Sequence, residues 1–353
     1  MALGESIFDV TYLIFILFLG FRLVLEKDKN AKLFGTMAIL LGLGDGFHLI
    51  PRVMGHLSPD GFEGFYSQLS WGKFITGITM TIFYLLFYFY YRSVSGDGDK
   101  NKKISIIVLS IVRILLILLP QNNWGSIEEN YTMAIVRNIP FLIMGILLII
   151  WTYKERDKAG LEKMSLLILL SFAFYIPVVL WANKFPMIGL LMMPKTVVYV
   201  LIVVFGFKHF VKDFTRRNLL NSSLSYLILG LSLGVFYREF TKAFNFYEEN
   251  HLSKLHPHTL VLGFILTITL YLLVKDIEKS KIKVLKKTFK IYNFGLLLTI
   301  SAMALYGIYD VVGIEKEAFM VSSLSGISGL GHIFLGTSLV MLFLKARSLV
   351  EKN

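Results

Sequence analysis

Three histidines in the last third of the chain have the residue type and spacing that metal or haem ligation needs. His256 and His258 open one apolar stretch, and His332 stands between glycines in another. Two residues apart on a helix, His256 and His258 cannot face the same way, so we expect His258 to point at a shared centre. Glycine neighbours leave room for the porphyrin plane, so that the imidazole of His332 could reach a haem iron as an axial ligand. His258 and His332 are therefore candidate axial ligands of a haem b, or ligands of a smaller metal ion such as copper or zinc.

Other residues bear on the same interpretation. Arg238 would suit a haem propionate, and Glu239 or Asp310 would accept a hydrogen bond from a ligating histidine. Against it, the two histidines are predicted at different depths, with His258 about four and His332 about twelve residues from the outer surface. At a rise of about 1.5 Å per residue, this difference is roughly 12 Å. Small residues in membrane helices also serve close packing, so a packing role for His332, hydrogen-bonded across a helix interface, stays open.

A second group of ionisable residues falls within or at the ends of apolar stretches in the first two thirds of the chain. Such residues are costly in a bilayer and therefore mark candidate functional sites. Asp45 and His48 share one helix face as a proton-linked pair, and four cations lie in the same half of the membrane. Together they predict an outward-facing pocket for a small anion. The candidate ligand-binding residues are Asp45, His48, Lys73, Arg113, Arg137 and Lys195.

The alternative interpretation gives these side chains no ligand. Lys73, Arg137 and Lys195 would extend to the outer lipid headgroups, as long basic side chains near helix ends do. Asp45 would then pair with Arg113. The amino-acid sequence leaves both interpretations open.

No motif points to an enzyme that acts on a soluble substrate. The chain has no Cys, which excludes disulfides, thiolate metal sites and cysteine nucleophiles. It also has no Walker loop, dinucleotide fingerprint, Gly-x-Ser-x-Gly or His-Glu-x-x-His motif. Asp45 and His48 are the only residues that we would assign to the chemistry of an intramembrane hydrolase. We therefore assign no catalytic residue and favour a binding, transport or assembly protein over an enzyme.

The composition indicates which elements must position these residues. Of the 353 residues, 55% are hydrophobic and 17% are charged, and the mean hydropathy is +0.66. Soluble domains carry about a quarter charged residues, so the composition predicts a polytopic membrane protein. The apolar stretches lack a period of two, which favours an all-α transmembrane bundle over a barrel. Eleven stretches approach or exceed the roughly 18–20 residues that cross a bilayer: 7–25, 33–53, 72–91, 104–120, 133–153, 164–183, 188–207, 221–241, 256–274, 289–310 and 320–344.

The loops between these stretches alternate in charge. One set, which includes 92–103, 154–163 and 275–290, holds most of the 36 basic residues, and the opposite set is net acidic. Basic residues in short loops favour the cytoplasm. We therefore predict an outside N-terminus, a cytoplasmic C-terminus and location in the cell membrane. The formal charge of +12 then follows from topology and contact with anionic lipid, with no nucleic acid partner.

A polar connection at Arg216-Arg217-Asn218 divides the predicted helices into two modules. Residues 1–217 are predicted to form a seven-helix transmembrane module, and residues 218–353 a four-helix transmembrane module. The second module carries the candidate haem or metal ligands, and the first carries the candidate anion pocket.

The four-helix module contains three short motifs: Tyr237-Arg238-Glu239-Phe240, His256-Pro257-His258 leading into Leu262-Gly263-Phe264, and Gly329-Leu330-Gly331-His332. On these motifs, residues 220–350 resemble a bacterial family of four-helix membrane proteins of unknown function, which implies no particular activity. The His-x-His motif is also similar to the haem-ligating helix of haem–copper oxidase subunit I. The chain lacks the further histidines that a copper centre beside the haem would need, so this resemblance does not imply oxygen reduction.

Two hypotheses from different functional classes follow. In the first, the four-helix module holds haem b between His258 and His332 for redox chemistry or gas sensing. In the second, the seven-helix module is a transporter or receptor for a small anion. The expected partners are the lipid bilayer and either another membrane protein or a second copy of the chain. Visible absorption distinguishes the hypotheses, because haem gives a Soret band and an anion pocket gives none.

Overall fold

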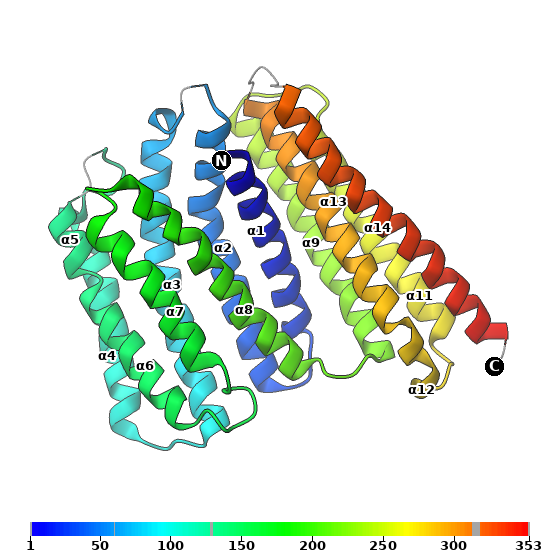
Figure 1. The fold of residues 1–353 in the computed structure, drawn as a ribbon, viewed down its shortest axis with the longest axis horizontal. Helices are drawn as coiled ribbons and strands as arrows, with labels where there is room; N and C mark the ends of the chain where they lie inside the picture. Colours follow the sequence, from blue (N-terminus) through cyan, green and yellow to red (C-terminus); the bar gives the residue numbers. More distant parts are fainter. Residues whose placement is uncertain (1, 60, 128–129, 313–317, 352–353) are drawn as a thin grey trace. The chain divides into compact units, whose positions relative to one another are not determined.

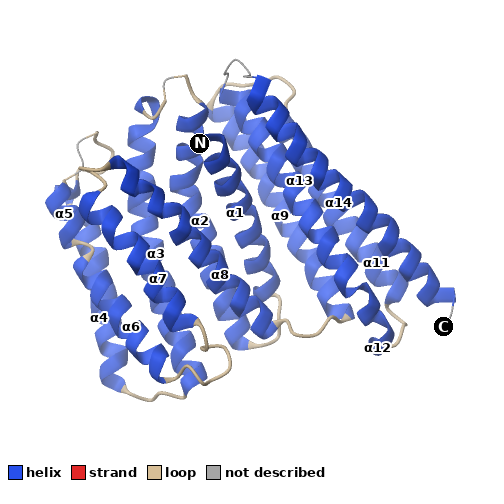
Figure 2. Cartoon of the chain, in the orientation of Figure 1, coloured by secondary structure: helices blue, strands red, loops and turns tan. Residues whose placement is uncertain are grey.

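A computed structural model describes residues 2–59, 61–127, 130–312 and 318–351 of the chain. Throughout these residues the chain forms helices joined by loops, with no β-strand (Figures 1 and 2). The predicted all-α helical bundle is thus confirmed.

Ten helical segments within the described residues are long and apolar enough to cross a membrane. They coincide with ten of the eleven predicted spans and make the chain a multipass membrane protein. The remaining predicted span, 104–120, is also helical and forms α4 (Lys100–Leu118). It falls outside the ten because three lysines near its start and Arg113 raise its charge.

The helices group into two compact units. Unit 1 contains residues 1–22, 52–64 and 211–353, and unit 2 contains residues 23–51 and 65–210. Helix α2 (Lys29–Leu57) contributes to both units, and the division falls at Pro51, which lacks the N–H for a helical hydrogen bond. The compact units therefore differ from the two sequence modules, because α1 (Ala2–Val24) and the end of α2 group with the C-terminal helices.

Unit 2 consists of the first part of α2 and of helices that run side by side (Figure 1). Helix α4 packs against α3 and α6, and α7 packs against α6 and α8. After α2, the helical elements of this unit are α3 (Tyr66–Ser95), α4, η2 (Pro120–Asn122), α5 (Tyr131–Val136), α6 (Ile139–Lys154), α7 (Met164–Trp181), η3 (Pro186–Leu191) and α8 (Met192–Phe210).

Aromatic rings fill the interior of unit 2, and most of them come from α3. Glycines on the surrounding helices make room for rings from other helices. A Cβ at Gly145 of α6 would lie 2.3 Å from the ring of Phe172, and a Cβ at Gly206 of α8 would lie 2.3 Å from the ring of Phe34. Aromatic side chains bury large areas and have few rotamers, so these contacts hold the helices of unit 2 in one register.

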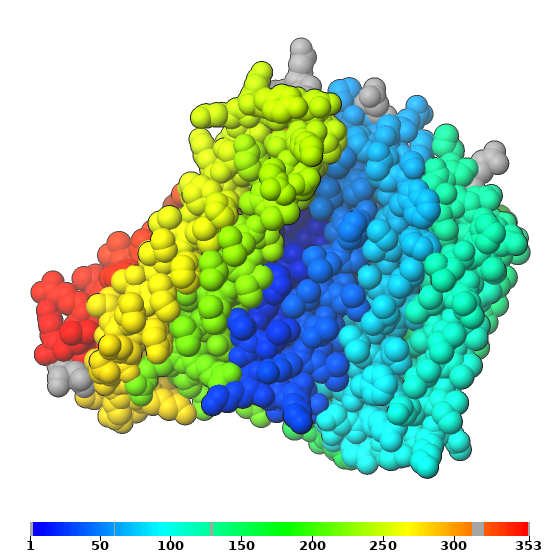
Figure 3. Space-filling view, turned by 180° about the vertical axis from the view of Figure 1, so that it is seen from behind, coloured from blue at the N-terminus to red at the C-terminus, as the bar shows by residue number. Residues whose placement is uncertain are grey.

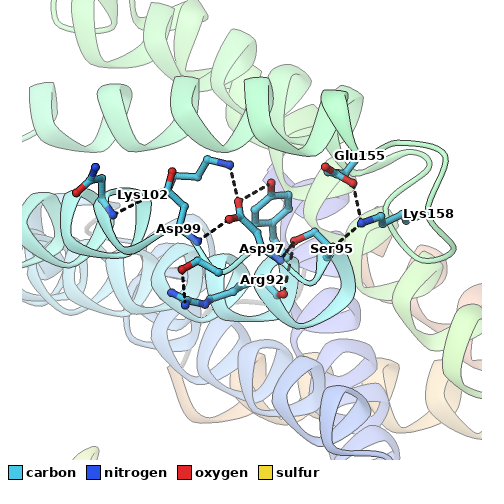
Figure 4. Close-up of polar contacts among 10 residues, drawn as sticks. Arg92, Ser95, Asp97, Asp99, Lys102, Glu155 and Lys158 are labelled. Atoms are coloured by element: carbon cyan, nitrogen blue, oxygen red, sulfur yellow. Dashed lines mark hydrogen bonds and ion pairs between the residues drawn. The ribbon is translucent and has the colours of Figure 1, made fainter.

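Two basic loops meet at one end of unit 2 (Figure 4). The Asp99 side chain caps α4 at its first N–H groups. Asp97 accepts a hydrogen bond from Lys102, and this bond holds the pKa of Asp97 below its ordinary value. Lys158, in the loop after α6, donates to the carbonyl of Ser95. The α3–α4 and α6–α7 loops, both in the predicted cytoplasmic set, thus lie at the same end of the unit.

Unit 1 is organised around α13 (Lys286–Val312), the most buried of the ten candidate spans. Helix α9 and the segment from α10 to α11 lie against each other along their length (Figure 3). The ring centroids of Phe18 in α1 and Tyr226 in α9 lie 4.6 Å apart. The remaining elements are η1 (Glu63–Phe65), α9 (Arg216–Ala243), α10 (His251–His258), the π-helical segment η4 (Thr259–Ile265), α11 (Leu266–Val274), α12 (Lys279–Ile282), η5 (Lys283–Leu285) and α14 (Ala318–Glu351).

Candidate functional site

The segment predicted as one helix over 133–153 is interrupted in unit 2. Helix α5 ends at Val136 and α6 begins at Ile139, which leaves Arg137 and Asn138 between them. Pro140 lies in the first turn of α6, where its missing N–H costs no hydrogen bond and its fixed φ favours a helix start. Arg137 is only 8% exposed, so the interruption places a buried cation beside the start of α6.

Asn138 occupies the N-cap position of α6 without capping the helix. An N-cap asparagine usually accepts a hydrogen bond from a first-turn N–H, and the Asn138 side chain makes no such bond. Its Oδ1 instead accepts hydrogen bonds from Arg113 Nη2 at 3.3 Å and from the Tyr175 hydroxyl at 3.0 Å. The positive end of the α6 dipole therefore has no side-chain cap, and a buried arginine lies beside it.

Arg113 of α4 is buried with unused hydrogen-bonding capacity. Only 3% of the residue is exposed, and its Cζ lies 3.4 Å from the centre of the Phe141 ring. Nε and Nη1 of Arg113 are buried and have no hydrogen-bond partner among the described residues. An unsatisfied buried donor costs about 1–3 kcal/mol, and more when the group is charged. Arg113 can therefore donate to a further acceptor at little further cost.

Lys195 of α8 is the third buried cation in this region, and we call Arg113, Arg137 and Lys195 the cation cluster. Lys195 is 8% exposed, and its Nζ lies 4.6 Å from the centre of the Tyr175 ring. It interacts electrostatically with Asp45 and Arg113. Within the part of the chain that the structure describes, it forms no hydrogen bond or ion pair. Arg137 also acts electrostatically on Arg113, so three positive charges share one buried region.

A network of hydroxyl groups adjoins the cation cluster. The Tyr84 hydroxyl lies 2.9 Å from Ser171 Oγ and 3.2 Å from the Tyr199 hydroxyl. The Tyr199 ring also lies 5.5 Å from Lys195 Nζ. These hydroxyl groups are neutral, so they do not neutralise the charge of the cation cluster.

The six predicted ligand-binding residues have different environments. Arg113, Arg137 and Lys195 come together as the cation cluster. Arg137 and Lys195 are each 8% exposed. These two side chains therefore lie inside the unit and do not extend toward lipid headgroups. Arg113 bonds Asn138 and not Asp45, so the alternative pairing of Arg113 with Asp45 is not found.

The other three residues lie on α2 and α3. Asp45 is half-buried and reaches the cluster electrostatically through Lys195. His48 lies where α2 approaches α3, since a Cβ on Gly72 would be 2.7 Å from the His48 Cα. Lys73 of α3 is exposed and is thus the residue of the predicted set that differs most from the buried cations.

An apolar groove of about 110 Å³ adjoins the cation cluster, between the α5–α6 junction and α7. Asn138, Phe141 and Tyr175 line it, and each of them also contacts Arg113 or Lys195. The groove and the cluster therefore share a wall. The rest of the groove lining is apolar and includes Ile135, Ile139, Leu142, Ile176, Val179 and Leu180.

The two predicted axial ligands in unit 1 lie on different helices, α10 and α14. His258 Nδ1 lies 2.9 Å from the carbonyl oxygen of Lys254, and His332 Nδ1 lies 2.7 Å from that of Ser328, each within its own helix. Over the described ranges, neither histidine has a hydrogen bond or ring contact with the other. His332 is exposed on α14, on the same face as Gly329.

His256, and not the expected His258, bonds the neighbouring helix. Its Nδ1 lies 2.9 Å from the carbonyl oxygen of Gly230 in α9. The reason is the helix start: Asn250 caps α10, which begins five residues before the predicted span. Buried Leu252 then sets the inner face of α10, and His256 follows it by one turn on that face. His258 falls on another face of the helix.

Arg238 and Glu239 do not join the histidines either. Arg238 Nε donates to Glu239 Oε1 at 2.8 Å, and the two side chains are 74% and 54% exposed at the end of α9. No group of three or more His, Cys, Asp or Glu residues that could hold a metal ion occurs among the described residues. Cofactor binding stays a prediction that the absorption spectrum tests.

The motif Leu262-Gly263-Phe264 has a structural role in the π-helical segment. Pro257, inside α10, lacks the N–H that a regular helix would use at this point. In the wider turn that follows, the carbonyl of Leu262 accepts a hydrogen bond from the Tyr292 hydroxyl. A Cβ at Gly263 would lie 2.5 Å from the Tyr226 ring, so only glycine lets that ring pack here.

The neutral residues that shape the cation cluster were missed at the level of sequence. For Asn138 a signal was available, because asparagine shortly before Pro140 is a helix-start pattern. Tyr84, Tyr175 and Tyr199 carry no such signal, since a tyrosine in an apolar run is also ordinary core material.

Two polar clusters in unit 1 were also not predicted. Glu5 Oε2 lies 2.7 Å from Arg52 Nη2 and 3.2 Å from His56 Nε2. His251 Nδ1 lies 2.7 Å from Asp310 Oδ2. The clusters join residues that are 47 to 59 positions apart, which no local spacing rule reveals.

Comparison with known families gives a match in unit 1. Residues 216–348, from α9 to α14, match the family model described as "Protein of unknown function (DUF2871)". The predicted resemblance of this region to a family of unknown function is thereby confirmed. That the family is one of bacterial four-helix membrane proteins, and that the His-x-His helix is similar to haem–copper oxidase subunit I, stay predictions. No curated protein and no solved structure matches the chain.

Proposed function

We propose that the protein binds a small anion within unit 2, at the cation cluster, as a transporter or receptor. The observation that carries this proposal is Arg113, which is 3% exposed and has two buried donors, Nε and Nη1, without a partner among the described residues. A carboxylate or phosphate group presents two oxygens in the geometry that a guanidinium group binds best.

The charge of the site supports an anionic ligand and not a cationic or neutral one. Three buried cations share the region, and the acid that acts on Lys195 is the half-buried Asp45. A buried charge without an ionic partner costs several kcal/mol, and a bound anion would offset that cost at Arg113, whose Nε and Nη1 have no hydrogen-bond partner among the described residues. The uncapped first turn of α6 adds N–H dipoles of the same sign.

The test is anion-dependent thermal stabilisation of the purified full chain in non-ionic detergent. Phosphate and acetate should raise the melting temperature relative to chloride at equal ionic strength, because a ligand bound only to the folded state stabilises it by mass action. Arg113→Gln keeps a polar side chain but loses the charge and the bidentate donors, so anion affinity should fall roughly 10–100-fold.

The control variant is Lys73→Gln, which removes an exposed cation of the same predicted set on α3. It should retain the stabilisation of the unmodified protein within a factor of two or so, as expected for an exposed charge. If neither anion stabilises the protein, or if Arg113→Gln and Lys73→Gln respond alike, the cation cluster is not an anion site.

We also propose that the protein lies in the cell membrane with its N-terminus outside, as the loop charges predict. The absence of Cys from the chain makes labelling of introduced cysteines selective. Gln121→Cys should react with a membrane-impermeant maleimide in intact cells, whereas Asp157→Cys should react only after permeabilisation. Both positions are exposed. The opposite labelling pattern would reverse the orientation and place the loop after α4 in the cytoplasm.

A further inference from the structure

The groove beside the cation cluster bears on which anions this site would take. The accessible lining is almost wholly apolar, and its two polar residues are Asn138 and Tyr175, which share a hydrogen bond of 3.0 Å. Asn138 Oδ1 also accepts from Arg113, and the Tyr175 ring contacts Lys195. Phe141 lines the groove with its ring and stacks on the Arg113 guanidinium group at 3.4 Å. One end of the groove therefore has buried cations directly behind it.

The remainder of the groove has the opposite character. From Leu142 on α6 to Val179 and Leu180 on α7, its lining is aliphatic. Ile139 is 51% exposed at its edge, so the groove opens on the surface of unit 2, within two segments that are apolar enough to cross a membrane. A hydrophilic anion gains nothing from such walls, whereas a hydrocarbon chain gains about 0.8 kcal/mol for each buried methylene group.

We infer that the ligand is an amphiphile, with a carboxylate or phosphate head at Arg113 and Lys195 and a single hydrocarbon chain in the groove. This inference rests on the proposed anion site and specifies the chemical class of its ligand. The head would accept hydrogen bonds from the unpartnered donors of Arg113, and the chain would pack against the aliphatic side chains of the groove. With a volume of about 110 Å³, the groove holds a short part of the chain, and the rest of a longer chain continues into the surrounding lipid.

The experiment measures the affinity of a series of carboxylates for the full chain in phosphatidylcholine nanodiscs. Acetate, butanoate, hexanoate and octanoate share one head and differ only in chain length. Affinity should rise about fourfold for each added methylene group that leaves water for the groove, which corresponds to about 0.8 kcal/mol. 1-Octanol, with the same chain and no charge, should bind at least tenfold more weakly than octanoate, as expected for loss of the charged head.

Two tryptophan variants separate the groove from general partitioning into the bilayer. Val179→Trp fills the groove and should abolish the advantage of octanoate over acetate, measured as the ratio of their affinities in the same variant. Leu169→Trp adds the same bulk on α7 at a 48% exposed position outside the groove and should leave that ratio unchanged.

The outcomes distinguish this inference from the proposed function. If acetate binds and chain length has no effect, the anion site stands and the amphiphile inference is wrong. If octanol binds as tightly as octanoate, or if Val179→Trp leaves the chain-length effect intact, the groove does not hold the chain of an anionic ligand. If no carboxylate or phosphate binds, both the inference and the anion site fail.

Discussion

Replacing Glu5 with alanine should lower the free energy of unfolding by about 3 kcal/mol, because removing one partner of a buried ion pair leaves the other charge uncompensated. The Glu5 side chain is 8% exposed and that of Arg52 is 23% exposed, and their contact at 2.7 Å joins α1 to the end of α2 within unit 1. His56 contacts the same carboxylate oxygen. The measurement is reversible unfolding of the full chain in mixed micelles.

Two further variants make this prediction specific to the ion pair. Glu63→Ala removes an exposed carboxylate in the nearby connection and should change stability by less than about 0.5 kcal/mol. Glu5→Leu combined with Arg52→Met replaces both charges by apolar side chains and should recover most of the loss, as seen when whole buried pairs are replaced. Equal effects of Glu5→Ala and Glu63→Ala would show that the pair contributes nothing measurable.

Gly72→Ala should destabilise the protein by about 1–3 kcal/mol, the usual cost of adding a methyl group to a closely packed interior. Its Cβ would lie 2.5 Å from the carbonyl oxygen of Phe47 and 2.7 Å from the Cα of His48. Both are backbone atoms of α2, so no side chain can rotate away, and α2 and α3 must separate. The melting temperature of the purified variant measures this effect.

The matched control lies on the facing helix. Gly46 of α2 has no atom within 4 Å of an added Cβ, so Gly46→Ala should be neutral or stabilising by up to about 1 kcal/mol, as expected for alanine in a helix. Gly72→Ala is thus expected to destabilise the protein, whereas Gly46→Ala is not. If both variants melt at the same temperature, the close approach at Gly72 is not a constraint on unit 2.

The family match and the candidate site occupy different parts of the protein. Residues 216–348, which match a family of unknown function, lie in unit 1, whereas the cation cluster and the groove lie in unit 2. Two motifs of the matched region hold its helices together. Gly263 leaves room for the ring of Tyr226, and His256 bonds the carbonyl oxygen of Gly230. The cation cluster and the groove, which we propose to bind a ligand, therefore lie outside the residues that the family model matches.

The amino-acid sequence alone determined the membrane class, the helical fold and three of the buried charges. Whether a segment crosses a bilayer depends on its own length and polarity, so ten of the eleven predicted spans recur as long apolar helices. An ionisable residue inside such a segment is costly in any tertiary context. Arg113, Arg137 and Lys195 could therefore be named as candidates before any neighbour of theirs was known.

Only the tertiary structure decided which of these residues act together. Arg113 and Asn138 are 25 positions apart and meet because α4 packs against α6 in one particular register. The interruption between α5 and α6 and the earlier start of α10 turned Arg137 and His256 onto inner faces. Successive side chains of a helix are rotated by about 100°, so an interruption such as that between α5 and α6 changes the direction of every later side chain relative to an unbroken helix. Composition and local spacing cannot specify the direction of these side chains. That direction decides whether the cations form a buried cluster or extend to the membrane surface.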